Sequence, residues 1–173
     1  RVVTRMPWEV YGFKVTATGE PLDIPSLIKG DETIQSTGNR AQALGFYQAA
    51  LNEKLSPVTR AETVERIATT QLSVDKPALT IRTLSDYFRF EKKSESEVPP
   101  RLAIIFGYAY GRQNNPSQAF GWFSKARKDS GLPQTATGAA RQGAAFVAHG
   151  LTEEQLQALE KTWGGDEFIR SCL

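Results

Sequence analysis

The stretch from Arg101 to Arg127 constrains the fold of this chain more than any other. Small and large apolar residues recur in it at i, i+3, i+4 and i+7, the spacing of one face of an α-helix. These residues are Ala103, Phe106, Gly107 and Tyr110 in its first half and Ala119, Phe123 and Ala126 in its second. Asn115 suits a helix N-cap and Pro116 the first helical position, so a turn separates the halves. The stretch predicts two closely packed helices, with Ala119 buried where they cross.

The same helical spacing recurs in other parts of the chain. It is followed by Ala43, Tyr47 and Ala50, by Val64, Ile67 and Ala68, by Thr80, Leu84 and Tyr87, by Ala140, Ala144 and Val147, and by Leu156, Leu159 and Trp163. If Ala43, Thr80, Ala119 and Leu156 are equivalent positions, they lie 37, 39 and 37 residues apart. A period this regular indicates repeated helix–turn–helix units rather than an arbitrary bundle.

This order of small and large residues resembles the tetratricopeptide repeat, a helix–turn–helix unit of about 34 residues. The resemblance covers residues 23–163 and is clearest between Arg101 and Arg127, although the longer steps require longer connections. Sel-one-like repeats are the second choice: they place Gly and Tyr as at Gly107 and Tyr110, but their usual Gly-x-Gly turn is missing after Gly111. The resemblance implies an all-α, right-handed superhelical stack of about four repeats, in which each unit buries its apolar face against its neighbours.

Local signals place the ends of the expected helices. Asp23 or Ser26 is expected to cap the first helix, which contains Gly30 at a cost of about 1 kcal/mol relative to Ala. Further helices are expected over 40–52 and 57–72 and from residue 77. The polar run 92–97 is interpreted as a solvated connection. The expected N-terminus of a late helix is a Thr152 cap with Gln155 three residues on, and Asp166-Glu167 begins a terminal turn.

Residues 1–22 do not follow the helical spacing. Apolar residues nearly alternate with polar ones around Trp8, and Pro7, Gly12 and Gly19 interrupt any helix. We therefore expect an extended N-terminal arm over 1–22, followed by the repeat domain over 23–173. The arm is expected to cover one end of the helices, burying Trp8; the alternative is an arm that docks on another domain or a partner chain.

Composition and motifs argue against several functional classes. The net charge is only +2 and the 21 basic residues are scattered, unlike the clustered surface of a nucleic-acid-binding protein. No apolar stretch reaches the length of a membrane span. Phosphate-loop, dinucleotide-binding, HExxH and CxxC motifs are absent, and the chain has one His and one Cys. We therefore expect no enzyme activity, cofactor or metal site, and Trp122 and Tyr108 are interpreted as packing residues rather than an aromatic ligand cage.

The family resemblance implies a scaffold that binds a protein or peptide partner through the concave face formed by the first helix of each unit. Projected onto this sequence, that face would contain Arg101, Ile104, Tyr108 and Arg112, with Glu65 and Thr69 from the preceding unit and Arg141 from the following one. The alternative is a structural spacer or assembly domain of a larger bacterial cell-envelope protein. The partner, the pathway and the oligomeric state stay open. The compartment also stays open, with the bacterial periplasm or envelope favoured over the cytoplasm.

Overall fold

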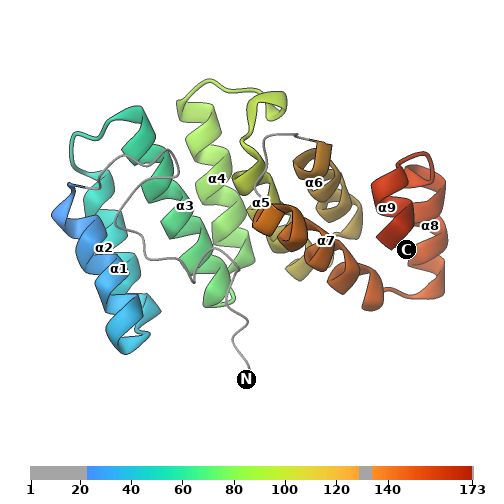
Figure 1. Ribbon diagram of the computed structural model, residues 1–173, viewed down its shortest axis with the longest axis horizontal. Coiled ribbons are helices and arrows are strands. Elements are labelled where there is room, and N and C mark those ends of the chain that lie inside the picture. Colours follow the sequence, from blue (N-terminus) through green and yellow to red (C-terminus); the bar gives the residue numbers. More distant parts are fainter. Residues whose placement is uncertain (1–22, 129–133, 173) are drawn as a thin grey trace. The chain divides into compact units, whose positions relative to one another are not determined.

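The computed structural model describes residues 23–128 and 134–172, and all regular structure in these residues is helical (Figure 1). The elements are α1 (Pro25–Thr37), α2 (Arg40–Leu51), α3 (Pro57–Ser73), α4 (Pro77–Phe90), the 3₁₀ turn η2 (Glu95–Glu97), α5 (Pro100–Arg112), α6 (Pro116–Lys128), α7 (Gln134–His149), α8 (Glu153–Trp163) and α9 (Glu167–Cys172). The all-α prediction is confirmed for the described residues. The predicted arm over 1–22, including Trp8, lies outside them.

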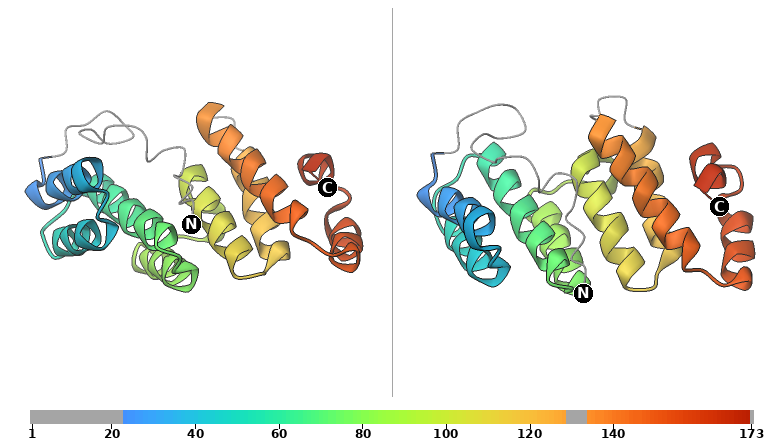
Figure 2. Two further views of the ribbon diagram at one scale, coloured as in Figure 1. Left: turned by 90° about the horizontal axis from the view of Figure 1, so that it is seen from below. Right: turned by 60° about the horizontal axis from the view of Figure 1, so that its bottom comes forward.

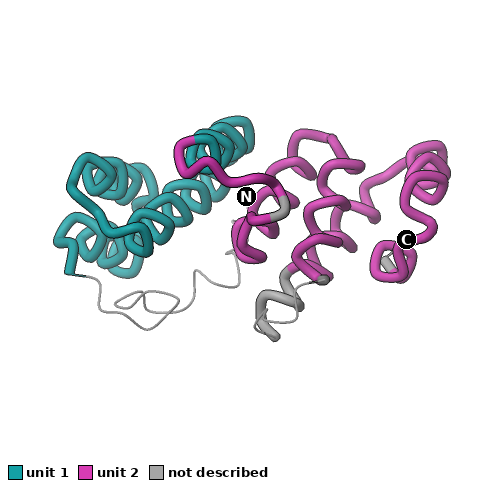
Figure 3. The backbone as a smooth tube through the Cα atoms, turned by 90° about the horizontal axis from the view of Figure 1, so that it is seen from above, with its two compact units in different colours: residues 1–89 teal, residues 90–173 magenta. Residues whose placement is uncertain are grey.

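The chain divides into two compact units (Figure 3). Unit 1 ends at Arg89 and contains α1 to α4, whereas unit 2 begins at Phe90 and contains η2 and α5 to α9. The boundary between the units falls at the end of α4, within residues 23–173, which the sequence predicts to be the repeat domain. No described helix combines the length and the apolar character needed to cross a membrane.

In unit 1, α2 packs against both α1 and α3. Its core contains five buried apolar residues of these helices: Leu27, Ala43, Tyr47, Ala50 and Ile67. Gly30 in α1 is buried, and a Cβ added there would overlap the ring of Tyr47. The glycine that weakens α1 as an isolated helix therefore lets α1 and α2 approach each other.

Side-chain caps explain the starts of several helices, but the predicted cap of α1 is wrong. α1 begins after Ile24, which provides no side-chain cap, so the expected cap by Asp23 or Ser26 is wrong. Ser26 lies within the helix, and its hydroxyl donates instead to Glu53. Side-chain caps do occur at Asn39, Ser56, Asn115 and Thr152, the last as the predicted capping box with Gln155.

The turns after α1, α3 and α5 each contain one residue in the left-handed region of backbone space. These residues are Gly38 (φ 68°), Asp75 (φ 62°) and Asn114 (φ 60°). Gly, Asp and Asn tolerate this conformation better than other residues. Each turn lets the next helix begin within a few residues.

In unit 2, α5, α6 and α7 lie side by side, each packed against the other two (Figure 2). Phe123 in α6 is fully buried, and its ring occupies the space that a side chain at Gly107 in α5 or Gly143 in α7 would need. A Cβ at either glycine would lie 2.5 Å from this ring. Ala119 is also fully buried, which confirms the predicted burial at the helix crossing.

The C-terminal helices complete unit 2. Leu159 of α8 is buried, whereas Leu156 and Trp163 are half-buried, so the predicted stripe on α8 covers the unit only in part. α9 packs against α6, α7 and α8, and its Ile169 is fully buried. Asp166 begins this helix by accepting from the Ile169 N–H (3.1 Å) and from the buried Ser124 hydroxyl of α6.

Candidate functional site

The residues predicted on α5 differ in accessibility. Arg101 and Tyr108 are half-buried and Arg112 is exposed, but Ile104 has no exposed surface. In this structure Ile104 therefore packs inside the molecule and is not part of an open binding face. Its hydrophobic neighbours Leu102 and Ile105 are buried as well, so α5 is covered over most of its circumference.

Tyr108 links the three packed helices of unit 2. Its ring makes an edge-to-face contact with Phe123 at 5.3 Å between centroids, and a Cβ at Gly143 would lie 3.0 Å from its Cζ. Burial raises the pKa of Tyr108 to about 12, although the positive charge of Arg112 lowers it in part. At neutral pH the side chain is therefore an uncharged hydroxyl on a ring held in place by packing.

The exposed face of α7 contains one feature that the sequence interpretation missed. Arg141 is exposed as expected, and Phe146 has 75% of its surface exposed. Ala140 and Ala144, on the opposite side of the helix, are fully buried. A signal for Phe146 did exist, because this large apolar residue falls outside the inward-facing set of α7. The name α5–α7 surface is used below for Tyr108 and Arg112 of α5 with Arg141 and Phe146 of α7.

Glu65 and Thr69 belong to unit 1 and are not brought together with this surface within one unit. Both are buried, and the Thr69 hydroxyl donates to the Glu65 carbonyl oxygen at 2.7 Å, within α3. All residues of α3 from Glu62 to Leu72 are buried, although many are polar. The sequence pattern had assigned only one face of this helix to the interior.

The polar burial of α3 centres on an ionic network. Arg66 Nε lies 2.9 Å from Asp31 Oδ1 of α1, and Arg66 Nη1 lies 2.9 Å from Glu62 Oε2. The Tyr47 hydroxyl of α2 donates to Asp31 at 2.6 Å. Burial acts to lower the pKa of Arg66, but the hydrogen bonds and charges of Asp31 and Glu62 outweigh it and raise that pKa above its usual value. The guanidinium therefore stays charged, and the network as a whole joins α1, α2 and α3.

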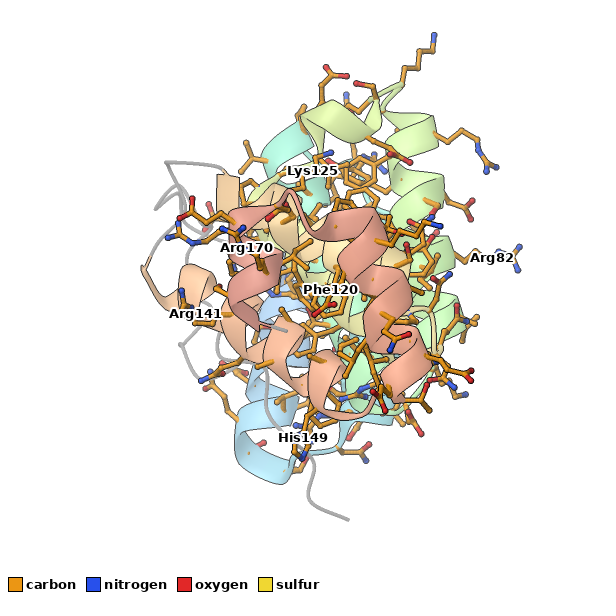
Figure 4. All side chains as sticks on the ribbon, turned by 90° about the vertical axis from the view of Figure 1, so that its right-hand side faces the viewer. Arg82, Phe120, Lys125, Arg141, His149 and Arg170 are labelled. Atoms are coloured by element: carbon orange, nitrogen blue, oxygen red, sulfur yellow. The ribbon has the colours of Figure 1, made fainter. Side chains whose placement is uncertain are left out.

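Unit 2 also contains a cavity of about 290 Å³ between η2, α6 and α8. It is lined by Glu95, Ser117, Gln118, Gly121, Trp122, Lys125 and Trp163. Trp122 is buried and stacked on Phe106 at 4.4 Å between centroids, which confirms that it is a packing residue. Figure 4 shows Lys125, which lines this cavity, and Arg141 at separate places around the unit.

Lys125 and Trp163 both line this cavity. Lys125 Nζ lies 5.0 Å from the centroid of the Trp122 ring; desolvation lowers the pKa of Lys125, and the charge of Glu95 opposes this shift. Trp163 Nε1 is buried and has no hydrogen-bond acceptor among the described residues. A buried donor without a partner costs about 1–3 kcal/mol.

Among the described residues, no group of three His, Cys, Asp or Glu side chains is arranged to hold a metal ion. Comparisons with protein-family models, curated proteins and solved structures find no significant match to this chain.

Proposed function

We propose that this chain is a non-enzymatic scaffold of tetratricopeptide-like repeats that binds a protein or peptide partner through the α5–α7 surface. The repeat interpretation is supported by recurring packing. Gly30 of α1 faces the Tyr47 ring of α2, and Gly107 of α5 faces the Phe123 ring of α6. In both pairs a glycine of the first helix accommodates an aromatic ring of the second.

The spacing of the second helices supports four repeats. α2, α4, α6 and α8 begin at Arg40, Pro77, Pro116 and Glu153, so the starts are 37, 39 and 37 residues apart. These steps equal those between Ala43, Thr80, Ala119 and Leu156 in the sequence. In this proposal α5 and α7 are the first helices of consecutive repeats, and α9 is a terminal cap.

The single observation that carries the binding proposal is the exposure of Phe146. A Phe side chain that is 75% exposed leaves a large apolar area in water, and covering it is worth about 25 cal/mol per Å². Phe146 and Arg141 belong to α7, which packs against α5, the helix that contains Tyr108 and Arg112. Aromatic residues and Arg are enriched among the residues that dominate protein–protein binding energy.

The proposal is tested by affinity capture with quantitative mass spectrometry, using the chain and its Phe146→Ser variant as baits. We expect at least one protein to be retained by the original chain and lost with Phe146→Ser. Leu79→Ser is a matched control, because Leu79 is also an exposed apolar residue (42%) but lies on α4 of unit 1.

The retained protein is then purified and titrated against both variants and against Arg141→Glu. A Kd that rises at least tenfold with Phe146→Ser and Arg141→Glu, and not with Leu79→Ser, supports the proposal. Equal binding by all three variants contradicts the assignment of the α5–α7 surface.

A further inference from the structure

The cavity between η2, α6 and α8 combines two opposite charges with an aromatic wall. Lys125 and Glu95 both line it, and they interact through their charges without forming an ion pair within the described part of the chain. Ser117, Gly121 and Lys125 are spaced by four residues on α6, so they lie along one face of that helix. A ligand in this cavity therefore meets a cation, a carboxylate and a strip of polar and small residues.

Glu95 is positioned by an ordered turn rather than by a free loop. The Ser94 N–H and the Ser94 hydroxyl both donate to Glu97 Oε2 at 2.8 Å, which closes a capping box around η2. These hydrogen bonds also lower the pKa of Glu97. The backbone that carries Glu95 is thus held next to the cavity before any ligand arrives.

The aromatic wall open to a ligand is that of Trp163. The Trp122 ring is already stacked on Phe106 and contacted by the Lys125 ammonium, and it is only 8% exposed. Trp163 is half-buried, and the edge of its six-membered ring lies over Gly121, where a Cβ would be 3.3 Å from Cζ2. Because position 121 has no side chain, the Trp163 ring can lie directly against α6 and form part of the cavity wall.

The volume limits the ligand to a small one. Cavities that bind small molecules usually measure about 300–1,000 Å³, so 290 Å³ is at the lower end and suits a single amino acid rather than a nucleotide. A ligand with one charge would find an oppositely charged partner in only one of Lys125 and Glu95. A ligand with both charges and a short apolar group would match the cation, the carboxylate and the indole.

We propose that this cavity binds a free, zwitterionic α-amino acid with an apolar side chain. The α-carboxylate faces Lys125 and the Ser117 hydroxyl, the α-ammonium faces Glu95, and the side chain packs on Trp163. This site is independent of the α5–α7 surface, so either proposal can fail without affecting the other.

The test uses L-leucine as the probe in isothermal titration calorimetry with the full chain. The Trp indole N–H signals in ¹H–¹⁵N NMR spectra report where it binds. Three analogues each remove one feature: leucinamide lacks the carboxylate, 4-methylpentanoate lacks the ammonium, and N-acetyl-L-leucine mimics a peptide C-terminus. We expect saturable binding of L-leucine, a shift of the Trp163 indole signal, and at least tenfold weaker binding of each analogue.

Variants assign the binding to the cavity. Lys125→Met and Glu95→Gln are each expected to weaken L-leucine binding at least tenfold, and Gly121→Val is expected to abolish it by displacing the Trp163 ring from the cavity wall. Lys161→Met and Glu154→Gln are matched controls, because both residues are exposed on α8 and neither lines the cavity. Thermal melts confirm that each variant is folded.

Three results would overturn the proposal. The first is the absence of saturable L-leucine binding by the folded chain. The second is binding that Lys125→Met and Glu95→Gln leave unchanged. The third is N-acetyl-L-leucine binding as tightly as L-leucine, which would identify the ligand as a peptide C-terminus instead.

Discussion

Units 1 and 2 both contain an aromatic ring packed against a glycine, but the structure shows a buried ionic network only in unit 1, among the described residues. In unit 1 the buried charges of Asp31, Glu62 and Arg66 connect α1 with α3, and the Tyr47 hydroxyl adds α2. In unit 2 the ring of Phe123 fills the space left by glycines in α5 and α7. A buried ion pair requires all its members, because a remaining charge cannot regain its hydration. A packed ring instead requires a fixed volume. Added atoms should therefore weaken both units, since Gly30 faces the Tyr47 ring as Gly107 faces Phe123, whereas loss of these charges should weaken unit 1 alone.

The largest expected effect is that of Arg66→Met. The variant keeps much of the side-chain volume but leaves the buried carboxylates of Asp31 and Glu62 without their cation, and we expect a loss of about 3–5 kcal/mol. Hydrogen exchange measured residue by residue should show faster exchange in α1 to α3 and little change in α5 to α7. Equal acceleration in both units would show that the network does not act within unit 1 alone.

The next effect concerns added volume in unit 2. Gly107→Ala places a methyl group against the Phe123 ring and should cost about 1–3 kcal/mol, measured by urea denaturation. Phe123→Leu should relieve the clash, so the double variant should lose less than the sum of the single variants. Strictly additive losses would mean that the two residues do not compete for the same space. Gly45→Ala is a control, because a Cβ at Gly45 meets nothing within 4 Å.

A smaller effect is expected at alkaline pH. Burial raises the pKa of Tyr108 to about 12, above the ordinary value of 10.0, so the folded state holds this proton more tightly than the unfolded state. The resulting stability is fully present below about pH 10 and is lost as the pH rises towards 12. The loss is on the order of 1–2 kcal/mol, because solvent screening reduces the effect at a partly exposed ring. Urea denaturation at pH 9 and 11.5 should show a smaller loss for Tyr108→Phe; an equal loss would contradict the assignment to Tyr108.

The smallest effect should come from an exposed ion pair of unit 1. Arg82 lies 3.8 Å from Asp86 on α4, and these side chains are 78% and 55% exposed. Arg82→Met should change the stability by less than about 0.5 kcal/mol, because exposed pairs are hydrated and screened. A loss approaching that of Arg66→Met would show that burial is not what distinguishes the two ion pairs.

The local features of the fold could be predicted from the sequence because they depend on local spacing. The inward-facing residues Ala43, Tyr47, Ala119 and Phe123 follow helical periodicity, and all are buried. The Thr152 capping box also needs only four consecutive residues. The Asp23 or Ser26 cap failed because α1 starts at Pro25, which needs no N–H partner at the first helical position.

The long-range features could not be predicted in the same way. The Asp31–Arg66 pair joins residues 35 positions apart, and no local pattern distinguishes these charges from exposed ones. The cavity likewise brings η2, α6 and α8 together, so neither Lys125 nor Trp163 could be assigned to it from spacing. The family resemblance placed Ile104 on an open face, but Ile104 is buried. Helical periodicity does not show which outer faces of a helix are covered by other helices.

The left-handed residues in the turns after α1, α3 and α5 also bear on how the chain folds. Each turn joins helices that are neighbours in sequence, so the first contacts close short loops, and chains with low contact order fold in about microseconds to milliseconds. The contact of Trp163 with Gly121 and that of Ser124 with Asp166 instead close loops of more than 40 residues. We therefore expect α8 and α9 to dock late, which would make the wall beside Trp163 the last part of unit 2 to assemble and the first to open.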